Sequence, residues 1–167
     1  MITMKRNQIL AAIVAVTLPS AVLVAQQGAP ATTSSHGELH SAGEIQWKDG
    51  PPALPKGAKF AVLEGDPTNE GMFLMRLRVP DGFHIPAHTH PIPERVTVIQ
   101  GTFKVAMGDS PKVANAKVLS AGGYAMLPPG MVHAAWMEGD TILQIHGDGP
   151  WGIKYVNPAD DPRNAQK

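Results

Sequence analysis

The sequence predicts an all-β domain, folded as a sandwich or barrel, and three observations lead to this prediction. The chain contains 17 Gly and 16 Pro among 167 residues, and both residue types interrupt helices and favour turns. From residue 58 onward, short apolar runs recur about every 8–12 residues with turn residues between them. No long segment shows helical periodicity. With 43% hydrophobic and 17% charged residues, the chain has enough apolar material for one folded domain.

The predicted strands mix β-branched, aromatic and aliphatic residues, and most of them end at Gly, Pro, Asn or Asp. Alternating side chains on a strand point to opposite faces, so each run can bury one face and expose the other. In chain order, we expect strands at residues 59–64, 72–79, 94–100, 102–107, 116–120, 124–127, 133–138, 141–146 and 151–156.

Residues 1–25 have the layout of a secretory signal peptide. Lys5 and Arg6 precede an apolar stretch at residues 9–25, and a polar run begins at Gln26. An uncleaved membrane anchor is the alternative, but the stretch is short for a span of about 20 residues and contains Pro19. We therefore expect cleavage after Ala25 and a periplasmic or secreted protein with no membrane attachment after cleavage.

The remainder of the chain divides by composition into three parts. Residues 26–57 are polar and then Pro-rich, which predicts a flexible linker followed by an extended arm that Trp47 and Leu54 anchor. Residues 58–157 contain the predicted strands and form the folded domain. The polar residues 158–167 predict a loose C-terminal tail.

Charge and cysteine content exclude several classes of function. The chain has 14 Lys and Arg against 14 Asp and Glu, without the basic excess of a nucleic-acid-binding domain, so we expect no nucleic-acid partner. It has no Cys, which excludes disulfides, thiolate metal sites and cysteine nucleophiles. Any metal has to be held by His, Asp or Glu.

A group of histidines with a nearby glutamate is the candidate metal site. His88 and His90 are two residues apart, so on a strand they project to one face. Glu94 follows a turn stiffened by two prolines and begins the next predicted strand, from which its carboxylate can return toward the pair. His133 follows a Pro-Pro-Gly turn and can supply a fourth ligand. A metal-free polar cluster in a binding pocket is the alternative, but four ligand-type side chains at this spacing favour a metal.

The segment around His88 resembles the first conserved motif of the cupins, G-x5-H-x-H-x3,4-E-x6-G. Gly82, His88, His90, Glu94 and Gly101 meet every fixed position of that motif. The resemblance extends over about residues 58–157.

The second cupin motif, G-x5-P-x-G-x2-H-x3-N, is met by Gly122, Pro128, Gly130 and His133. Its final Asn is replaced by Met137, which should make the interior more apolar because residues 133 and 137 share a strand face. The chain is also similar to the narrower group of cupins related to the sensor domain of ChrR-type anti-sigma factors.

The cupin resemblance implies an antiparallel jelly-roll β-barrel with a metal at its mouth. The ligands that it implies are His88, His90, Glu94 and His133, and a divalent transition metal such as Fe, Mn, Ni, Co, Cu or Zn suits that set. A small-molecule substrate or ligand is implied, and a homodimer is a family expectation.

Further residues are candidates for the lining of the pocket. Tyr124 and Met126 share parity and are candidates for the barrel interior beside Met137. The position of His146 has two alternatives. If Gln144 faces the barrel interior, His146 does so too; if Leu143 and Ile145 face the interior, His146 lies on the surface. His84 has the parity of His88, but Pro86 intervenes, and we expect His84 at the surface.

Three functions remain open at this stage. The first is a metal-dependent enzyme of the dioxygenase type that acts on a small organic molecule, although the sequence identifies no catalytic acid or base beyond the ligands. The second is a non-catalytic module that binds a small ligand or senses a metal. The third is a scaffold with a structural metal. Fold resemblance does not choose between them, because one fold supports many chemistries.

Overall fold

A computed structural model describes residues 37–164 of the chain. The chain divides into two units, Met1–Glu38 and Leu39–Lys167, and the structure below is that of the second unit. The predicted signal peptide and the start of the predicted linker lie outside the described residues. Within residues 37–164, no helix is long and apolar enough to cross a membrane.

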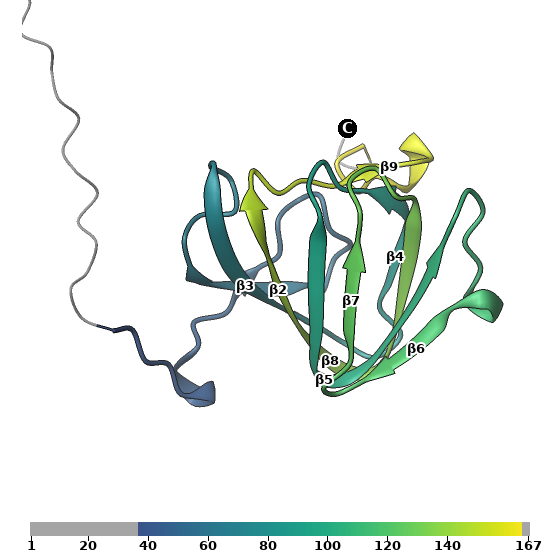
Figure 1. Ribbon diagram of the computed structural model, residues 1–167. Helices are drawn as coiled ribbons and strands as arrows, with labels where there is room; N and C mark the ends of the chain where they lie inside the picture. Colours follow the sequence, from purple (N-terminus) through teal and green to yellow (C-terminus); the bar gives the residue numbers. More distant parts are fainter. Residues whose placement is uncertain (1–36, 165–167) are drawn as a thin grey trace, which may run out of the picture. The chain divides into compact units, whose positions relative to one another are not determined.

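The second unit is built from antiparallel β-strands and three short 3-10 helices (Figure 1), which confirms the predicted all-β class. The strands are β1 (Lys48–Asp49), β2 (Lys59–Glu64), β3 (Gly71–Val79), β4 (His84–Thr89), β5 (Glu94–Met107), β6 (Lys117–Ser120), β7 (Tyr124–Leu127), β8 (His133–Gly149) and β9 (Lys154–Tyr155). The 3-10 helices are η1 (Ala42–Glu44), η2 (Val113–Asn115) and η3 (Pro158–Asp160).

Two long strands, β5 and β8, join the two halves of the structure. The first part of β5 pairs with β7 and with the last part of β8, and β8 continues this half through β3, β2 and β1. The second part of β5 pairs with β6 and with the first part of β8, and β4 and β9 complete that half. The sheet therefore folds over itself around a common interior, as in a jelly-roll barrel.

Glycines allow β5 and β8 to bend where they pass from one half to the other. Gly101 in β5 and Gly139 in β8 have φ angles of 78° and 70°, in the left-handed region that favours Gly. A Cβ atom at Gly101 would lie 2.8 Å from the carbonyl oxygen of Asp140, so a side chain has no room there. The sequence predicted separate strands on either side of these glycines, but the backbone continues through each bend as a single strand.

The hydrophobic core lies between the two halves and follows the predicted alternation. In β3, Phe73, Met75, Leu77 and Val79 are buried, whereas Arg78 is exposed. Leu143 and Ile145 of β8 and Val96 and Val98 of β5 meet them from the neighbouring strands.

A bulge in β4 changes which of its residues face the core. His84 pairs with Trp136 and Ile85 with Ala135, but His88 is the next residue in register and pairs with His133. Three steps along β4 thus match two steps along β8, so β4 holds one extra residue. Because one extra residue reverses the alternation of faces, His84 and His88 point to opposite sides although they are four residues apart.

The arm around Leu54 and the described part of the tail both contact the folded domain. In the arm, Leu54 belongs to the core and β1 pairs with β2. The tail differs from the loose segment that the sequence predicts: the side chain of Arg163 donates a hydrogen bond to the carbonyl of Ile153, and that of Asn164 donates one to the carbonyl of Pro158. These polar side chains satisfy backbone carbonyls, an interaction that composition does not reveal.

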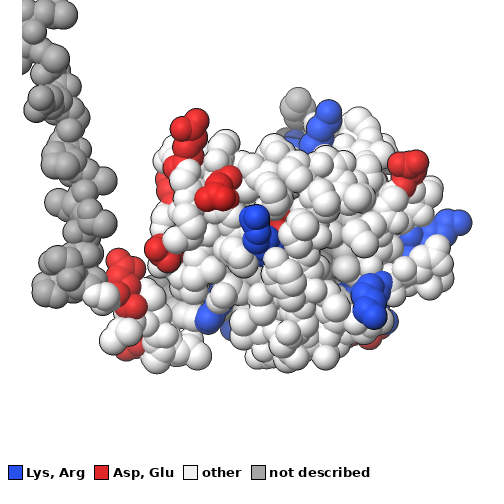
Figure 2. Space-filling view, viewed as in Figure 1, with Lys and Arg blue, Asp and Glu red and all other residues white. Residues whose placement is uncertain are grey.

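Charged side chains are interspersed with wide uncharged areas on the face of the molecule shown in Figure 2. Acidic and basic groups both occur on this face, and neither sign forms one continuous surface across it.

Candidate metal centre

Three buried histidines converge at one end of the barrel interior. His88 comes from the end of β4, His90 from the turn just after it, and His133 from the start of β8. Their side chains are 2–4% exposed, and one ring nitrogen from each lies within 4.8 Å of the others. The structure therefore brings together three of the four residues in the predicted ligand set, although β4 ends one residue before His90.

Each of these histidines uses its Nδ1 atom in a hydrogen bond with a backbone carbonyl. His88 bonds to Pro86 at 2.7 Å, and His133 bonds to Met131 at 3.0 Å. His90 bonds to Gly152 at 2.6 Å. A carbonyl only accepts, so Nδ1 carries the proton and a neutral ring leaves Nε2 with a free lone pair. This pattern fixes the orientation and tautomer of metal-binding histidines.

Glu94 lies at the start of β5 beside two of the histidines. Its Oε2 atom is 3.3 Å from Nε2 of His90 and 3.7 Å from Nε2 of His133. Burial by itself raises the pKa of Glu94, but the attraction of His90 and the contact with His133 hold the pKa well below its ordinary value. The structure thus places an ionised carboxylate next to the imidazoles, where the sequence predicted the fourth ligand.

Burial and neighbouring charge shift the pKa values of His88 and His90 in opposite directions. Burial and the proximity of His133 and His90 lower the pKa of His88 to about 3, so this ring is neutral at physiological pH. Burial also acts to lower the pKa of His90, but the carboxylate of Glu94 outweighs it and the net pKa is raised. A neutral imidazole is the form that binds a metal.

The space and the donor atoms at this point fit a metal ion. The four side chains border a small void of about 20 Å³. Nε2 of His90 is buried and makes no hydrogen bond among the described residues, although Oε2 of Glu94 lies 3.3 Å away, and buried nitrogen atoms are rarely left this way. Three imidazoles and a carboxylate are donors that Fe, Mn, Co, Ni, Cu and Zn accept. The cluster can therefore hold a divalent transition metal.

The rest of the void is lined by apolar side chains. Met137 is 1% exposed and lies among them, as predicted from its position four residues after His133. Among the described residues that line the void, no Ser, Thr, Lys, Asp or Tyr is present. Glu94 and the histidines are the titratable groups of this lining, so any proton transfer within it depends on them or on a bound molecule.

Two predicted lining residues lie on the outer face instead. Tyr124 and Met126 are 54% and 50% exposed, because in register Met126 lies opposite Arg95 and Tyr124 opposite Thr97, on the outward side of β5. The inward position of β7 belongs to Leu127, which pairs with Glu94. The prediction that Tyr124 and Met126 line the barrel is wrong.

His146 is also on the outer side of the sheet. Its neighbours Leu143 and Ile145 are buried in the core, and in register His146 lies opposite Arg95. Of the two alternatives that the sequence left open, the structure therefore has the apolar residues inside and His146 outside the metal centre.

Sequence reasoning missed the segment that fixes His90. The ring of Trp151 stacks on His90 with centroids 5.3 Å apart, and the carbonyl of Gly152 accepts the hydrogen bond from His90. Leu54 of the arm lines the same void. These contacts join residues far apart in the sequence, and a Trp in a Gly- and Pro-rich stretch gives no periodic pattern that indicates such a role.

The described residues have a cupin-type fold with this histidine cluster at one end of the barrel interior. The sequence profile of a domain of unknown function, DUF4437, matches residues 18–155, so the chain belongs to that family. No curated protein matches the chain in sequence.

Several solved structures have a similar fold. An RmlC-like cupin from Shewanella frigidimarina is 21% identical with a TM-score of 0.52, over 66% of this chain and 89% of its own. The polyketide cyclase RemF from Streptomyces resistomycificus is 14% identical with a TM-score of 0.62, over 78% and 93%. A putative acetylacetone dioxygenase from Methylibium petroleiphilum is 21% identical with a TM-score of 0.56, over 76% and 85%. At these identities the likeness shows the fold.

The anti-sigma factor ChrR of Rhodobacter sphaeroides, solved in complex with SigE, also matches at 21% identity, over 65% of this chain and 51% of its own. Its TM-score is 0.48.

Proposed function

We propose that this protein is a metal-dependent enzyme of the dioxygenase type that acts on a small organic molecule. The observation that carries the proposal is the convergence of three buried imidazoles, each with Nδ1 bonded to a backbone carbonyl, so that the neutral ring keeps the lone pair of Nε2 for a metal. We propose His88, His90, His133 and Glu94 as the metal ligands. A metal with six ligands would keep two positions for other molecules beyond these four.

The residues of the site would contribute in three ways. When bound, a divalent transition metal supplies Lewis acidity toward an oxygen atom of a substrate or of dioxygen. The histidines hold their nitrogen atoms in place through the backbone carbonyls, and Glu94 supplies negative charge beside two of them. The apolar lining keeps bulk water away, which strengthens electrostatic interactions inside the site.

Metal content and oxygen uptake test this proposal together. We expect the wild-type protein to retain one Fe, Mn, Co, Ni or Cu per chain and to consume oxygen with a suitable small substrate. His133→Ala should lose the metal, whereas His146→Ala, on the outer face, should keep it. Stoichiometric metal in His133→Ala would contradict the ligand assignment.

A non-catalytic module that binds a small ligand or senses a metal is the second candidate. The absence of any further acid or base among the described lining residues favours it. Tightly bound Zn with four protein ligands and no turnover would support this candidate, because such a site is closed in the manner of structural zinc.

We also propose that the protein works outside the cytoplasm, in the periplasm or after secretion. The support is the basic, apolar and then polar order of residues 1–28. N-terminal sequencing of the protein from cell fractions tests it: export predicts a mature chain that begins near Gln26, and an intact Met1 in the cytoplasmic fraction would contradict it.

A further inference from the structure

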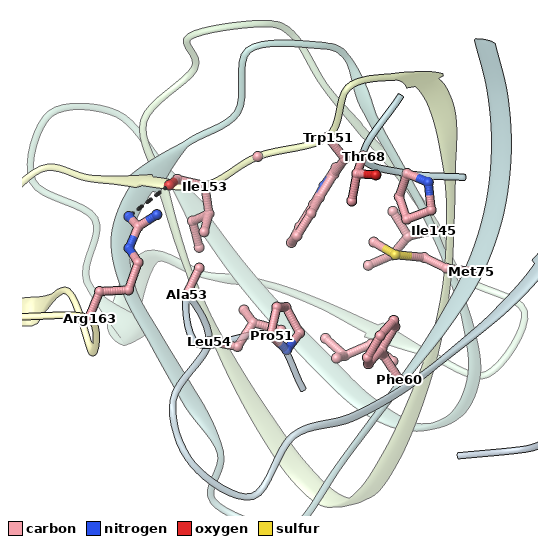
Figure 3. Close-up of a pocket in the computed structure, with 13 residues that line it drawn as sticks. Pro51, Ala53, Leu54, Phe60, Thr68, Met75, Ile145, Trp151, Ile153 and Arg163 are labelled. Atoms are coloured by element: carbon pink, nitrogen blue, oxygen red, sulfur yellow. Dashed lines mark hydrogen bonds between the residues drawn. The ribbon is translucent and has the colours of Figure 1, made fainter. Parts of the chain in front are cut away.

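A second and larger cavity, shown in Figure 3, shares lining residues with the void at the candidate metal centre. Its volume is about 270 Å³, the size of a small organic molecule rather than of an ion or a single water. The arm contributes Pro51, Ala53 and Leu54, and Trp151 and Ile153 come from the segment before β9. Phe60 of β2, Met75 of β3 and Ile145 of β8 complete the lining.

The lining of this cavity is apolar and carries no free charge. Arg163 is its one charged residue among the described side chains. The guanidinium of Arg163 donates to both carboxylate oxygens of Asp161 at 2.7 and 2.6 Å, and to the carbonyl of Ile153 at 3.2 Å. Its charge is therefore neutralised by a neighbour. An anion in the cavity would lose its hydration without meeting an unpaired cation. Its transfer from water would therefore cost free energy.

The cavity and the void at the histidines are separated by shared side chains. Leu54, Leu77, Ile145, Trp151 and Ile153 line both spaces. The Trp151 ring also stacks on His90. A molecule that contacts Trp151 in the cavity is therefore separated from a proposed metal ligand only by the indole ring. A binding space next to the candidate metal centre thus exists, bordered by side chains of the core.

We propose that this cavity binds an uncharged, mainly apolar small molecule of about 10–15 non-hydrogen atoms. Burial of apolar surface against Phe60, Met75 and Trp151 drives binding. That such a molecule is the substrate rests on the proposed function, but the affinity of the cavity for this class of ligand does not depend on the metal.

Two matched probes test the chemical class. At neutral pH 2-naphthol is uncharged and 2-naphthoate is an anion of nearly the same shape. We expect calorimetry with the full-length protein to show 2-naphthol binding at least about tenfold tighter than 2-naphthoate, because the carboxylate has no unpaired cation to meet. Equal binding, tighter binding of the anion, or no binding of 2-naphthol would overturn the proposal.

A pair of variants tests the location. Ala53→Phe fills the cavity from the arm, and we expect it to weaken 2-naphthol binding at least about tenfold, since the volume it occupies is lost to the ligand. Ala114→Phe places the same side chain on an exposed position of η2 and should leave binding unchanged. Unaltered affinity in Ala53→Phe would place the probe elsewhere and overturn the proposal. If a second copy of the chain covers the cavity, dimerisation that Ala53→Phe alone abolishes would overturn it as well.

The outcome is distinguishable from that of the metal proposal. Binding of 2-naphthol to protein treated with a chelator, or to His133→Ala, would support the cavity even if the metal assignment fails. Full metal content together with no 2-naphthol binding would remove the cavity proposal and leave the metal centre standing.

Discussion

His84 and His88 lie on the same strand, four residues apart, and have opposite environments. His84 is on the outer face, where its ring stacks on Trp136 with centroids 5.0 Å apart. His88 is buried in the candidate metal centre. The bulge in β4 accounts for the difference, because its extra residue reverses the alternation between them. The same segment supplies the Pro86 carbonyl that accepts from Nδ1 of His88.

β8 repeats this contrast over a longer distance. His133 at its start faces inward, and His146 near its end faces outward. In both strands the face decides whether a histidine lies at the candidate metal centre. In β4 the bulge sets this face, whereas in β8 the alternation of buried and less buried residues keeps the same parity at both ends. The predictions below test this contrast between inner and outer side chains.

Removal of His88 should have the largest effect on the metal centre. We expect His88→Ala to weaken metal binding by more than about 100-fold, since a ligand loss should exceed the 10–100-fold effect of removing a supporting group. His84→Ala should keep full metal content by elemental analysis. Equal retention by the two variants would break the contrast between the faces of β4.

Acid should destabilise the metal-free protein through His88. Its pKa is about 3 in the folded state and near 6.5 as a free group, so the unfolded chain takes up a proton first as pH falls. Stability from this residue is complete above pH 6.5 and is lost progressively toward pH 3, by about 3 kcal/mol between pH 7 and pH 4.

Denaturant unfolding at pH 7 and pH 4 measures this effect. Glu94, with its lowered pKa, acts in the same direction, and His90, with its raised pKa, acts in the opposite one. The informative quantity is therefore the difference between wild type and His88→Asn. A pH dependence that His88→Asn leaves unchanged would show that His88 is not held neutral by burial.

We expect smaller effects on metal affinity from changes at the tryptophans that stack on the inner and outer histidines. Trp151→Leu removes the ring that packs on His90, and we expect metal affinity to fall about tenfold, as for other groups that orient a ligand. Trp136→Leu removes the ring stacked on His84 and should not change metal affinity. A metal titration of both variants checks this, and equal losses would point to general destabilisation.

We expect the smallest effect on stability and metal affinity from a change at Tyr155. This residue is buried, and its hydroxyl contacts the arm. Its ring lies 6.0 Å from that of His88, while its hydroxyl donates a hydrogen bond to the carbonyl of Ala53 at 2.8 Å. Tyr155→Phe should cost about 1 kcal/mol of unfolding free energy and leave metal affinity unchanged. A clear loss of metal would show that the hydroxyl supports the centre as well.

Much of the fold and of the ligand cluster was predictable because the determinants are local. The short sequence spacing of His88, His90 and Glu94 predicted that their side chains lie close together. The second cupin motif predicted that His133 joins them. The glycines of the two motifs mark real constraints on the chain: Gly82, Gly101, Gly122 and Gly130 all have φ between 73° and 85°, where other residues are strained.

What the sequence could not settle depends on register and on distant contacts. Alternation in β7 allows either face to be buried, and the pairing of Leu127 with Glu94 decides against Tyr124 and Met126. The contact of Trp151 with His90 and that of Leu54 with the void bridge segments far apart in the chain. No local pattern encodes these approaches.

The pairing of β5 with β8 has a consequence for the order in which the molecule is made. Arg95 pairs with His146 and Met107 with His133, so a nascent chain that ends before residue 133 contains β4 and β5 but lacks the strand that joins the two halves. Such non-local pairing is slow to form compared with local contacts. The chain then has His88, His90 and Glu94 but no third imidazole. A metal at the proposed centre would therefore be bound completely only after β8 is in place, late in folding.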